Sequence, residues 1–187
     1  MYSMVQAGSM GLPFIGVRGL LGSDLLRQRP DLKVEGNPFH PGEEVVIVPP
    51  IRPDVAVFHA LQADRWGNAI TAGLRDDLMM ARAARRVIVT TEEITDQDLT
   101  LQDAVNNTFL PAIHVDGVVH AHCGAHPCRC GPLYPADAVH IKEYLNAAKG
   151  EETFRAYLDK YVYSVSSQQE YLQKAGVAAF TCEGNRQ

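Results

Sequence analysis

A helix that leads directly into a β-branched strand is the feature that most constrains the fold. Residues 76–86 have the spacing of a short amphipathic helix, and Asp76 and Asp77 stand where acidic side chains favour a helix N-terminus. Residues 87–91, Val-Ile-Val-Thr-Thr, follow without a linker and predict a buried strand. Strands of this kind belong to parallel sheets that are covered by helices. The pair predicts an α/β fold with an open, mostly parallel sheet and flanking helices.

The remaining elements follow from turn residues and periodicity. The apolar run at 13–17, bounded by glycines, predicts a buried strand near the start. Residues 44–49 and 54–61 predict two further strands, and residues 63–68 carry the signals of a hairpin turn. Residues 136–175 predict a helical C-terminal tail. A core strand at 13–17 would need sheet neighbours, so we expect one domain, residues 1–187, that lacks an N-terminal part.

The composition of the chain indicates a globular protein and argues against several classes of function. With 187 residues and 46% hydrophobic residues, the chain is long and apolar enough for a globular core. A net charge of −5 argues against nucleic acid as a partner. No apolar run reaches the length of a membrane span, and the start has no signal-peptide pattern. We therefore expect no membrane association and a cytoplasmic location.

Reactive side chains are concentrated in residues 120–134, the Cys/His loop. Residues 120–130 contain three of the seven His and three of the four Cys, enough donors for tetrahedral zinc. Cys128 and Cys130 are closer together than paired zinc ligands usually are, and Pro127 stiffens the segment before them. His120 and His122 end a predicted strand, where they could ligate or simply share a face. We expect no metal, and either buried thiols or a shaped substrate loop.

Several motifs occur in an order that resembles a known family. They include Met-Gly-Leu-Pro-Phe at 10–14, Asn-Pro-Phe at 37–39, Ala-Asp with Gly-Asn at 63–68, and Gly-Ala-His-Pro at 124–127 followed by Cys130 and Leu-Tyr at 133–134. This series resembles the α (A-type) subunits of glutaconate CoA-transferases, which are class I CoA-transferases. The resemblance covers essentially the whole chain.

The resemblance implies an open α/β fold in both subunits of a heteromeric enzyme. In such enzymes a glutamate carboxylate attacks an acyl-CoA thioester, and covalent catalysis splits the acyl exchange into two steps. That glutamate lies on the β subunit, so we expect no catalytic residue in this chain. The implied substrates are an acyl-CoA and a short (di)carboxylic acid, with no further cofactor, and the implied partner is a β subunit. The alternatives are a CoA-thioester hydrolase or decarboxylase subunit of the same fold, and a non-catalytic metal-binding or assembly module.

Five residues are candidates for substrate or CoA binding. His126, with Gly124 and Ala125 beside it, is expected to donate to a carboxylate or thioester oxygen of the substrate; alternatively its imidazole holds the loop by bonding a backbone carbonyl. Glu92 and Glu93 follow the strand at 87–91, where α/β folds bind ligands. The alternative for both glutamates is a charged strand end or a helix N-terminus.

Overall fold

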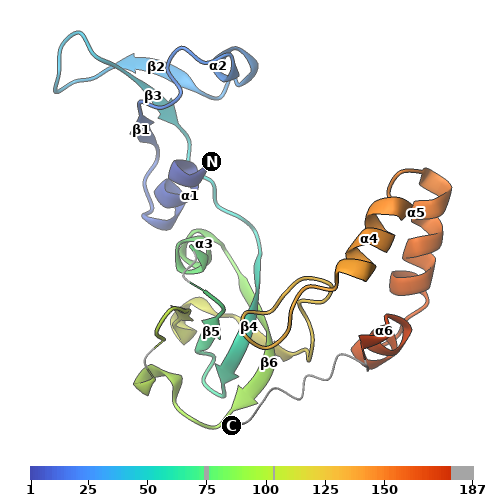
Figure 1. The fold of residues 1–187 in the computed structure, drawn as a ribbon. Coiled ribbons are helices and arrows are strands. Elements are labelled where there is room, and N and C mark those ends of the chain that lie inside the picture. Colours follow the sequence, from blue (N-terminus) through green and yellow to red (C-terminus); the bar gives the residue numbers. More distant parts are fainter. Residues whose placement is uncertain (74–75, 103, 178–187) are drawn as a thin grey trace.

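The centre of the molecule is a five-stranded sheet in the order β7-β5-β4-β6-β8 (Figure 1). The computed structural model describes residues 1–73, 76–102 and 104–177. The strands are β4 (Ala56–Asp64), β5 (Ala69–Thr71), β6 (Val87–Thr95), β7 (Thr108–Leu110) and β8 (Gly117–His120). β4, β6 and β8 run parallel to one another, whereas β5 and β7 extend the sheet in the antiparallel sense. The α/β fold is confirmed, and its sheet is mixed because the hairpin after β4 reverses the chain.

Helix α3 (Asp77–Ala83) covers one face of this sheet and confirms the predicted helix-to-strand connection. The core beneath it consists mainly of small side chains, which let the helix approach the sheet closely. Its buried members are Ala56, Phe58, Ala60, Ala63, Ala69, Ala81, Val87, Val89 and Leu110. Side chains of β6 alternate as a strand requires, with Val87 and Val89 in this core and Ile88 between them on the other face.

The N-terminal residues form a separate small sheet, shown at the top left of Figure 1. Helix α1 (Tyr2–Ser9) precedes β1 (Ile15–Val17), and α2 (Leu25–Gln28) precedes the antiparallel strands β2 (Lys33–Gly36) and β3 (Glu44–Val48). β1 pairs antiparallel with β3 at the edge of this sheet. The predicted strand at 13–17 does form, over Ile15–Val17, but it is only partly buried and does not belong to the main sheet, so the prediction of a buried core strand was wrong. The strand has only three residues, and it pairs with β3, about thirty residues further along the chain. The hydrophobic pattern of a single strand does not indicate which distant strand it pairs with.

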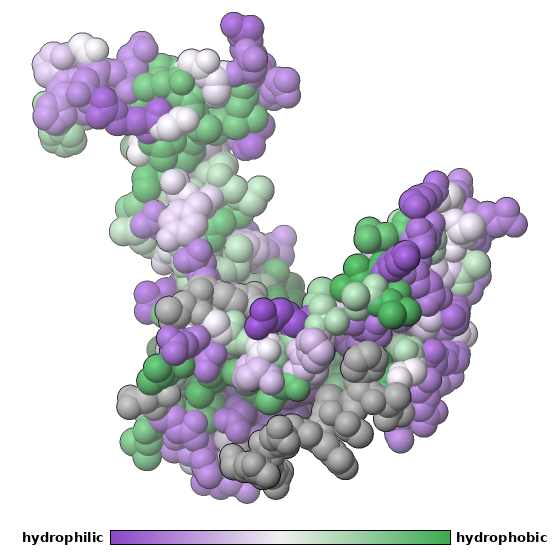
Figure 2. Space-filling view, viewed as in Figure 1, coloured by the Kyte–Doolittle hydropathy of each residue, from purple (hydrophilic) through white to green (hydrophobic). Residues whose placement is uncertain are grey.

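The C-terminal residues form a helical arm that projects from the sheet (Figure 1). We call residues 138–174 the C-terminal arm; it contains α4 (Ala138–Ala147), α5 (Glu151–Leu158), a π-helical turn η3 (Asp159–Tyr163) and α6 (Gln168–Lys174). The predicted helical tail is confirmed. Its apolar side chains are only partly covered: Tyr161 is buried, whereas Leu145 and Val139 are exposed. Figure 2 shows apolar surface on the α4 side of this arm.

Two short 3-10 turns, η1 (Leu99–Leu101) and η2 (Ala112–His114), complete the secondary structure of the described residues. Within those same residues, no helix has both the length and the apolar character needed to cross a bilayer.

Candidate functional site

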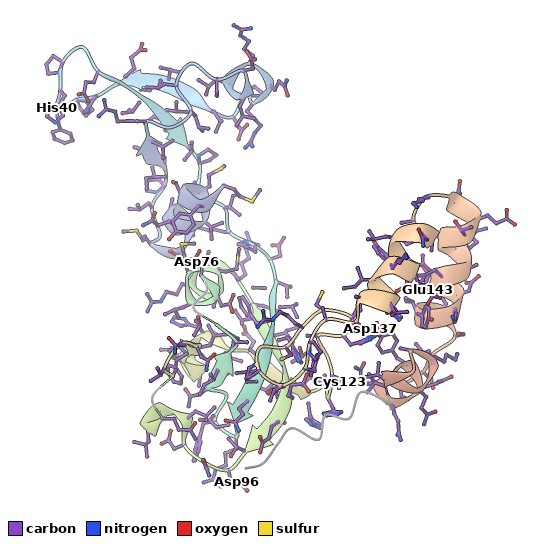
Figure 3. The ribbon with its side chains drawn as sticks, in the orientation of Figure 1. His40, Asp76, Asp96, Cys123, Asp137 and Glu143 are labelled. Carbon is purple, nitrogen blue, oxygen red and sulfur yellow. The ribbon has the colours of Figure 1, made fainter. Side chains whose placement is uncertain are left out.

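The Cys/His loop follows β8 and lies between the sheet and the C-terminal arm, where Figure 3 labels Cys123 and Asp137. Two different polar clusters hold this loop. One cluster surrounds Glu92 in the sheet and contacts both ends of the loop, and the other surrounds His126, in the middle of the loop, beside the N-terminus of α4.

Glu92 is a buried carboxylate that ties the loop to two strands. Its Oε1 accepts hydrogen bonds from His59 Nε2 at 2.6 Å and from the Tyr134 hydroxyl at 2.5 Å. The backbone N–H groups of Cys123 and Gly124 donate to its Oε2 and Oε1, at 2.7 and 3.2 Å. Because these donors come from β4 and from both ends of the loop, a single carboxylate fixes the shape of the loop against the sheet.

The hydrogen bonds hold Glu92 in its ionised form. Burial raises the pKa of this carboxyl, but the hydrogen bonds from His59, Tyr134 and Cys123 together lower it further, so its pKa lies below the ordinary value. Burial and the adjacent carboxylate raise the pKa of Tyr134, which therefore keeps its proton and acts as a donor. A carboxylate stabilised by four hydrogen bonds is a poor nucleophile, since attack on a carbonyl would require it to lose several of them.

The structure brings three of the predicted binding residues together and separates a fourth from them. Glu92 and Gly124 are hydrogen-bonded, and the N–H of Ala125 donates to the Tyr134 hydroxyl at 3.0 Å. Glu93 is exposed and accepts a hydrogen bond from Gln62 Nε2 on the neighbouring strand at 2.9 Å. The substrate-binding roles of these residues stay predictions.

His126, the fifth predicted binding residue, stands in the second cluster. Its Nδ1 lies 2.7 Å from the Tyr171 hydroxyl of α6, and its Nε2 lies 3.2 Å from Oδ2 of Asp137. The imidazole is only 5% exposed. Both ring nitrogens thus have partners within the chain, which supports the alternative that His126 holds the loop. Its partners are side chains of the C-terminal arm and its N-cap, not the backbone carbonyl that we expected; a role in substrate binding stays a prediction.

Sequence reasoning missed several members of these clusters. Asp137 accepts hydrogen bonds from the N–H groups of Val139 and His140 and caps α4, so the N-cap preference for Asp ahead of a helix could have identified it. His59 lies within the predicted strand at 54–61, and only the pairing of β4 with β6 places it beside Glu92. No local signal predicts that pairing.

Gly124 is a position where a side chain would disturb the first cluster. A Cβ atom there would lie 2.7 Å from the carbonyl oxygen of Ala121 and 2.7 Å from Cε1 of His59. We expect Gly124→Ala to reduce the free energy of unfolding by about 1–3 kcal/mol, the range typical of forced overpacking. Gly117→Ala is the matched control, since a Cβ at Gly117 would meet nothing within 4 Å. Urea unfolding monitored by circular dichroism measures both; equal stabilities of the two variants would contradict the prediction.

Comparison with known proteins identifies the family to which this chain belongs. The family described as coenzyme A transferase matches residues 1–121, more than half of the chain. The chain therefore belongs to the coenzyme A transferase family.

Individual relatives agree with this assignment. The chain is 38% identical to the A subunit of glutaconate CoA-transferase from Acidaminococcus fermentans, over 94% of this chain and 59% of that protein. It is 37% identical to the A subunit of 3-oxoadipate CoA-transferase from Pseudomonas knackmussii, over 90% of this chain and 58% of that protein. The chain thus spans less than two thirds of the length of these relatives.

Solved structures extend the similarity to the fold. The crystal structure of the Acidaminococcus fermentans glutaconate CoA-transferase matches 95% of this chain and 61% of that chain, with a TM-score of 0.86 and 36% identity. The decarboxylase AibA/AibB matches 83% of this chain and 57% of that chain, with a TM-score of 0.68 and 37% identity. The resemblance seen in the sequence motifs is confirmed.

Proposed function

We propose that this chain acts as the A-type (α) subunit of a CoA-transferase that moves CoA between an acyl-CoA and a short (di)carboxylic acid. The nucleophilic glutamate is supplied by a partner β subunit. The observation that carries the proposal is the match to the A subunit of glutaconate CoA-transferase, in sequence and in fold, over nearly the whole chain.

The chemistry of the loop supports the assignment of the nucleophile to another chain. Glu92 is a carboxylate that the sheet brings to the Cys/His loop, and its hydrogen bonds commit both oxygens to holding that loop. This chain then contributes shape: the segment containing Gly124, Ala125 and His126 forms one wall of the acid-binding cleft. Turnover requires a second polypeptide to complete the cleft and to attack the thioester.

An exposed apolar surface on the main sheet supports association with a partner. Val57, Ile88 and Val119 are 62%, 39% and 52% exposed. Val57 pairs in register with Ile88, and Val119 lies one strand further along the same sheet. Strands of a parallel sheet are normally covered on both faces, so an uncovered apolar row of this kind favours association with another polypeptide.

A second candidate function keeps the fold and changes the reaction. The similarity to the decarboxylase AibA/AibB supports it, because that protein shares the fold at a comparable level of identity. Hydrolysis of a CoA thioester is the related alternative. Transfer, hydrolysis and decarboxylation give different products, so an analysis of the products distinguishes the three reactions.

The test compares the purified chain alone with the chain mixed with a B-type subunit of a CoA-transferase, using acetyl-CoA and glutaconate. We expect no turnover by the chain alone. In the mixture we expect glutaconyl-CoA to form at the rate at which acetyl-CoA disappears, because transfer conserves the thioester. Chromatography of the CoA esters, a colorimetric assay of thiols and a measurement of released CO2 distinguish the outcomes.

The outcomes separate the candidates clearly. Equal formation of acetate and glutaconyl-CoA without release of thiol supports the transferase. Release of CoA thiol indicates a hydrolase. Release of CO2 from glutaconyl-CoA, supplied in a separate reaction because acetyl-CoA has no carboxylate to lose, indicates a decarboxylase. Turnover by the chain alone, with contaminating enzyme excluded by a heat-denatured control and by repeat purification, would overturn the placement of the nucleophile on a partner.

A further inference from the structure

Among the described residues, three groups bring potential metal ligands within 4.8 Å of one another. They are His59 with Glu92 and Cys130; Glu92 with His122 and Cys123; and His126 with Asp137 and His140. Atomic separations distinguish them. Two ligands of one tetrahedral zinc ion, each about 2.0–2.1 Å from the metal, are about 3.3 Å apart. His59 Nε2 and Glu92 Oε1 are only 2.6 Å apart, which is a direct hydrogen bond. The first group is thus a hydrogen-bonded cluster. In the second group Glu92 Oε2 already accepts the backbone N–H of Cys123 at 2.7 Å, and the His122 ring, 3.5 Å from that oxygen, is 52% exposed.

We propose that His126, Asp137 and His140 form a binding site for a divalent first-row transition-metal ion, with Zn²⁺ as the first candidate. His126 Nε2 and Asp137 Oδ2 are 3.2 Å apart. A charge-assisted hydrogen bond between an imidazolium and a carboxylate is typically about 2.7–2.9 Å long. The observed separation is at the long end of the range for a neutral N–H···O hydrogen bond and is also close to the spacing of two ligands on one ion, so the same two atoms can bind a metal once the Nε2 proton is lost.

The surrounding hydrogen bonds leave one potential ligand atom on each of the three residues, and one such atom from each residue lies within 4.8 Å of the others. His126 Nδ1 is 2.7 Å from the Tyr171 hydroxyl, which leaves Nε2 to ligate. His140 Nε2 is 2.8 Å from the Tyr157 hydroxyl, which leaves Nδ1. Asp137 accepts two backbone hydrogen bonds on Oδ1, which leaves Oδ2. Metal-ligating imidazoles almost always have their other nitrogen held by such a partner, because that bond fixes the tautomer and the ring.

The three side chains are shielded from bulk solvent, and their donor atoms favour one class of ion. The His126 and Asp137 side chains are 5% and 9% exposed, and His140 is 3% exposed. The Tyr161 ring packs against His140 with ring centroids 4.6 Å apart. Two imidazoles with one carboxylate suit zinc and its first-row neighbours, whereas calcium and magnesium prefer oxygen ligands. Three protein ligands leave a fourth position for water or another small ligand.

This site departs from the expectation of no metal for a specific reason. That expectation rested on spacings within residues 120–130, whereas two of the three proposed ligands lie at the start of the C-terminal arm. The loop thiols take no part in it. A bound ion would join the Cys/His loop to α4, so it should also stabilise the arm. The inference is independent of the proposed CoA chemistry, and failure of either one leaves the other standing.

The test uses the full chain, treated with a chelator and then dialysed against Zn²⁺ or Co²⁺, with elemental analysis and visible absorption spectra of the Co²⁺ form. We expect one ion per chain and Co²⁺ absorption bands of the intensity typical of four-coordination. Asp137→Asn is the principal variant, because Asn preserves the N-cap of α4 while removing the anionic ligand. We expect Asp137→Asn and His140→Gln to lower the affinity at least 100-fold. Tyr157→Phe removes only a supporting hydrogen bond and should lower it about 10-fold.

Two matched variants locate the ion. Cys128→Ser, at an exposed thiol in the same loop, should bind metal as the unaltered chain does. His59→Gln should do the same, because the His59 ring bonds Glu92 and Thr90 and none of the three proposed ligands. No stoichiometric metal in the unaltered chain overturns the proposal, and so does binding that is lost in His59→Gln but retained in Asp137→Asn. If Asp137→Asn or His140→Gln fails to fold by circular dichroism, Tyr157→Phe decides: unchanged affinity in that variant overturns the site.

Discussion

Replacing Glu92 by Ala is expected to lower the free energy of unfolding by about 3–5 kcal/mol, as for the loss of one partner from a buried charged network. The variant would leave the His59 ring, the Tyr134 hydroxyl and two backbone N–H groups without their shared acceptor. Each unsatisfied buried donor carries a desolvation cost. Urea unfolding at pH 7, followed by circular dichroism, measures the change.

Glu93 provides the matched control for this prediction, because it is the next residue of the same strand and carries the same charge. Its carboxylate is exposed and has one hydrogen bond, from Gln62. We expect Glu93→Ala to change the free energy of unfolding by no more than about 0.5 kcal/mol, as is usual for surface positions. Similar losses in both variants would show that Glu92 does not hold the loop.

The pH dependence of stability gives a second measurement on the same carboxylate. The folded-state pKa of Glu92 lies below its ordinary value of 4.5, so its ionised form is favoured by folding. Its contribution is therefore fully present above about pH 4.5 and is lost as the pH falls toward the folded-state pKa. The pKa values of Asp64 and Asp137 are also lowered, so acid weakens the fold at several places. The difference between the unaltered chain and Glu92→Gln isolates Glu92, and that difference should shrink below pH 4.5.

The helices and the hairpin turn that depend on residues close together in the chain could be predicted from the sequence. The helix before β6, the hairpin after β4 and the helical arm each depend on residues close in the chain. The Glu92 cluster depends on register: β4 and β6 pair so that His59 lies opposite Thr90, and this brings its ring to Glu92. A register between distant strands is set by packing in three dimensions, and one sequence contains no local signal for it.

The same limit explains why the sequence identified His126 without establishing its environment. The motif Gly-Ala-His-Pro marked the residue, but its partner Tyr171 lies 45 positions later, in α6. The sequence left two roles open, substrate donor and loop brace, and these roles predict different effects of mutation. The structure shows both ring nitrogens engaged, which makes the outcome of one substitution informative.

We expect His126→Ala to lower the free energy of unfolding by about 2 kcal/mol, because the Tyr171 hydroxyl and the Asp137 carboxylate would each lose a buried partner. The protein is kept with a chelator so that a bound ion contributes nothing. The loss should be local as well as global: amide hydrogen exchange should accelerate in α4 and α6, while β4 and β6 stay protected. His122→Ala is the control, since that ring is 52% exposed, and it should leave exchange in the arm unchanged.

Activity distinguishes the two roles of His126. The activity is measured in the mixture with a B-type subunit. If His126 only holds the loop, turnover by His126→Ala should fall in proportion to the folded fraction and should recover on cooling. A substrate donor predicts a fall in kcat/KM at full stability, with normal exchange in α4 and α6. If His126→Ala keeps its stability but loses turnover, the hypothesis that His126 only holds the loop is contradicted. Because the partners of His126 all belong to the C-terminal arm and its N-cap, the exchange pattern shows directly whether the imidazole connects that arm to the loop.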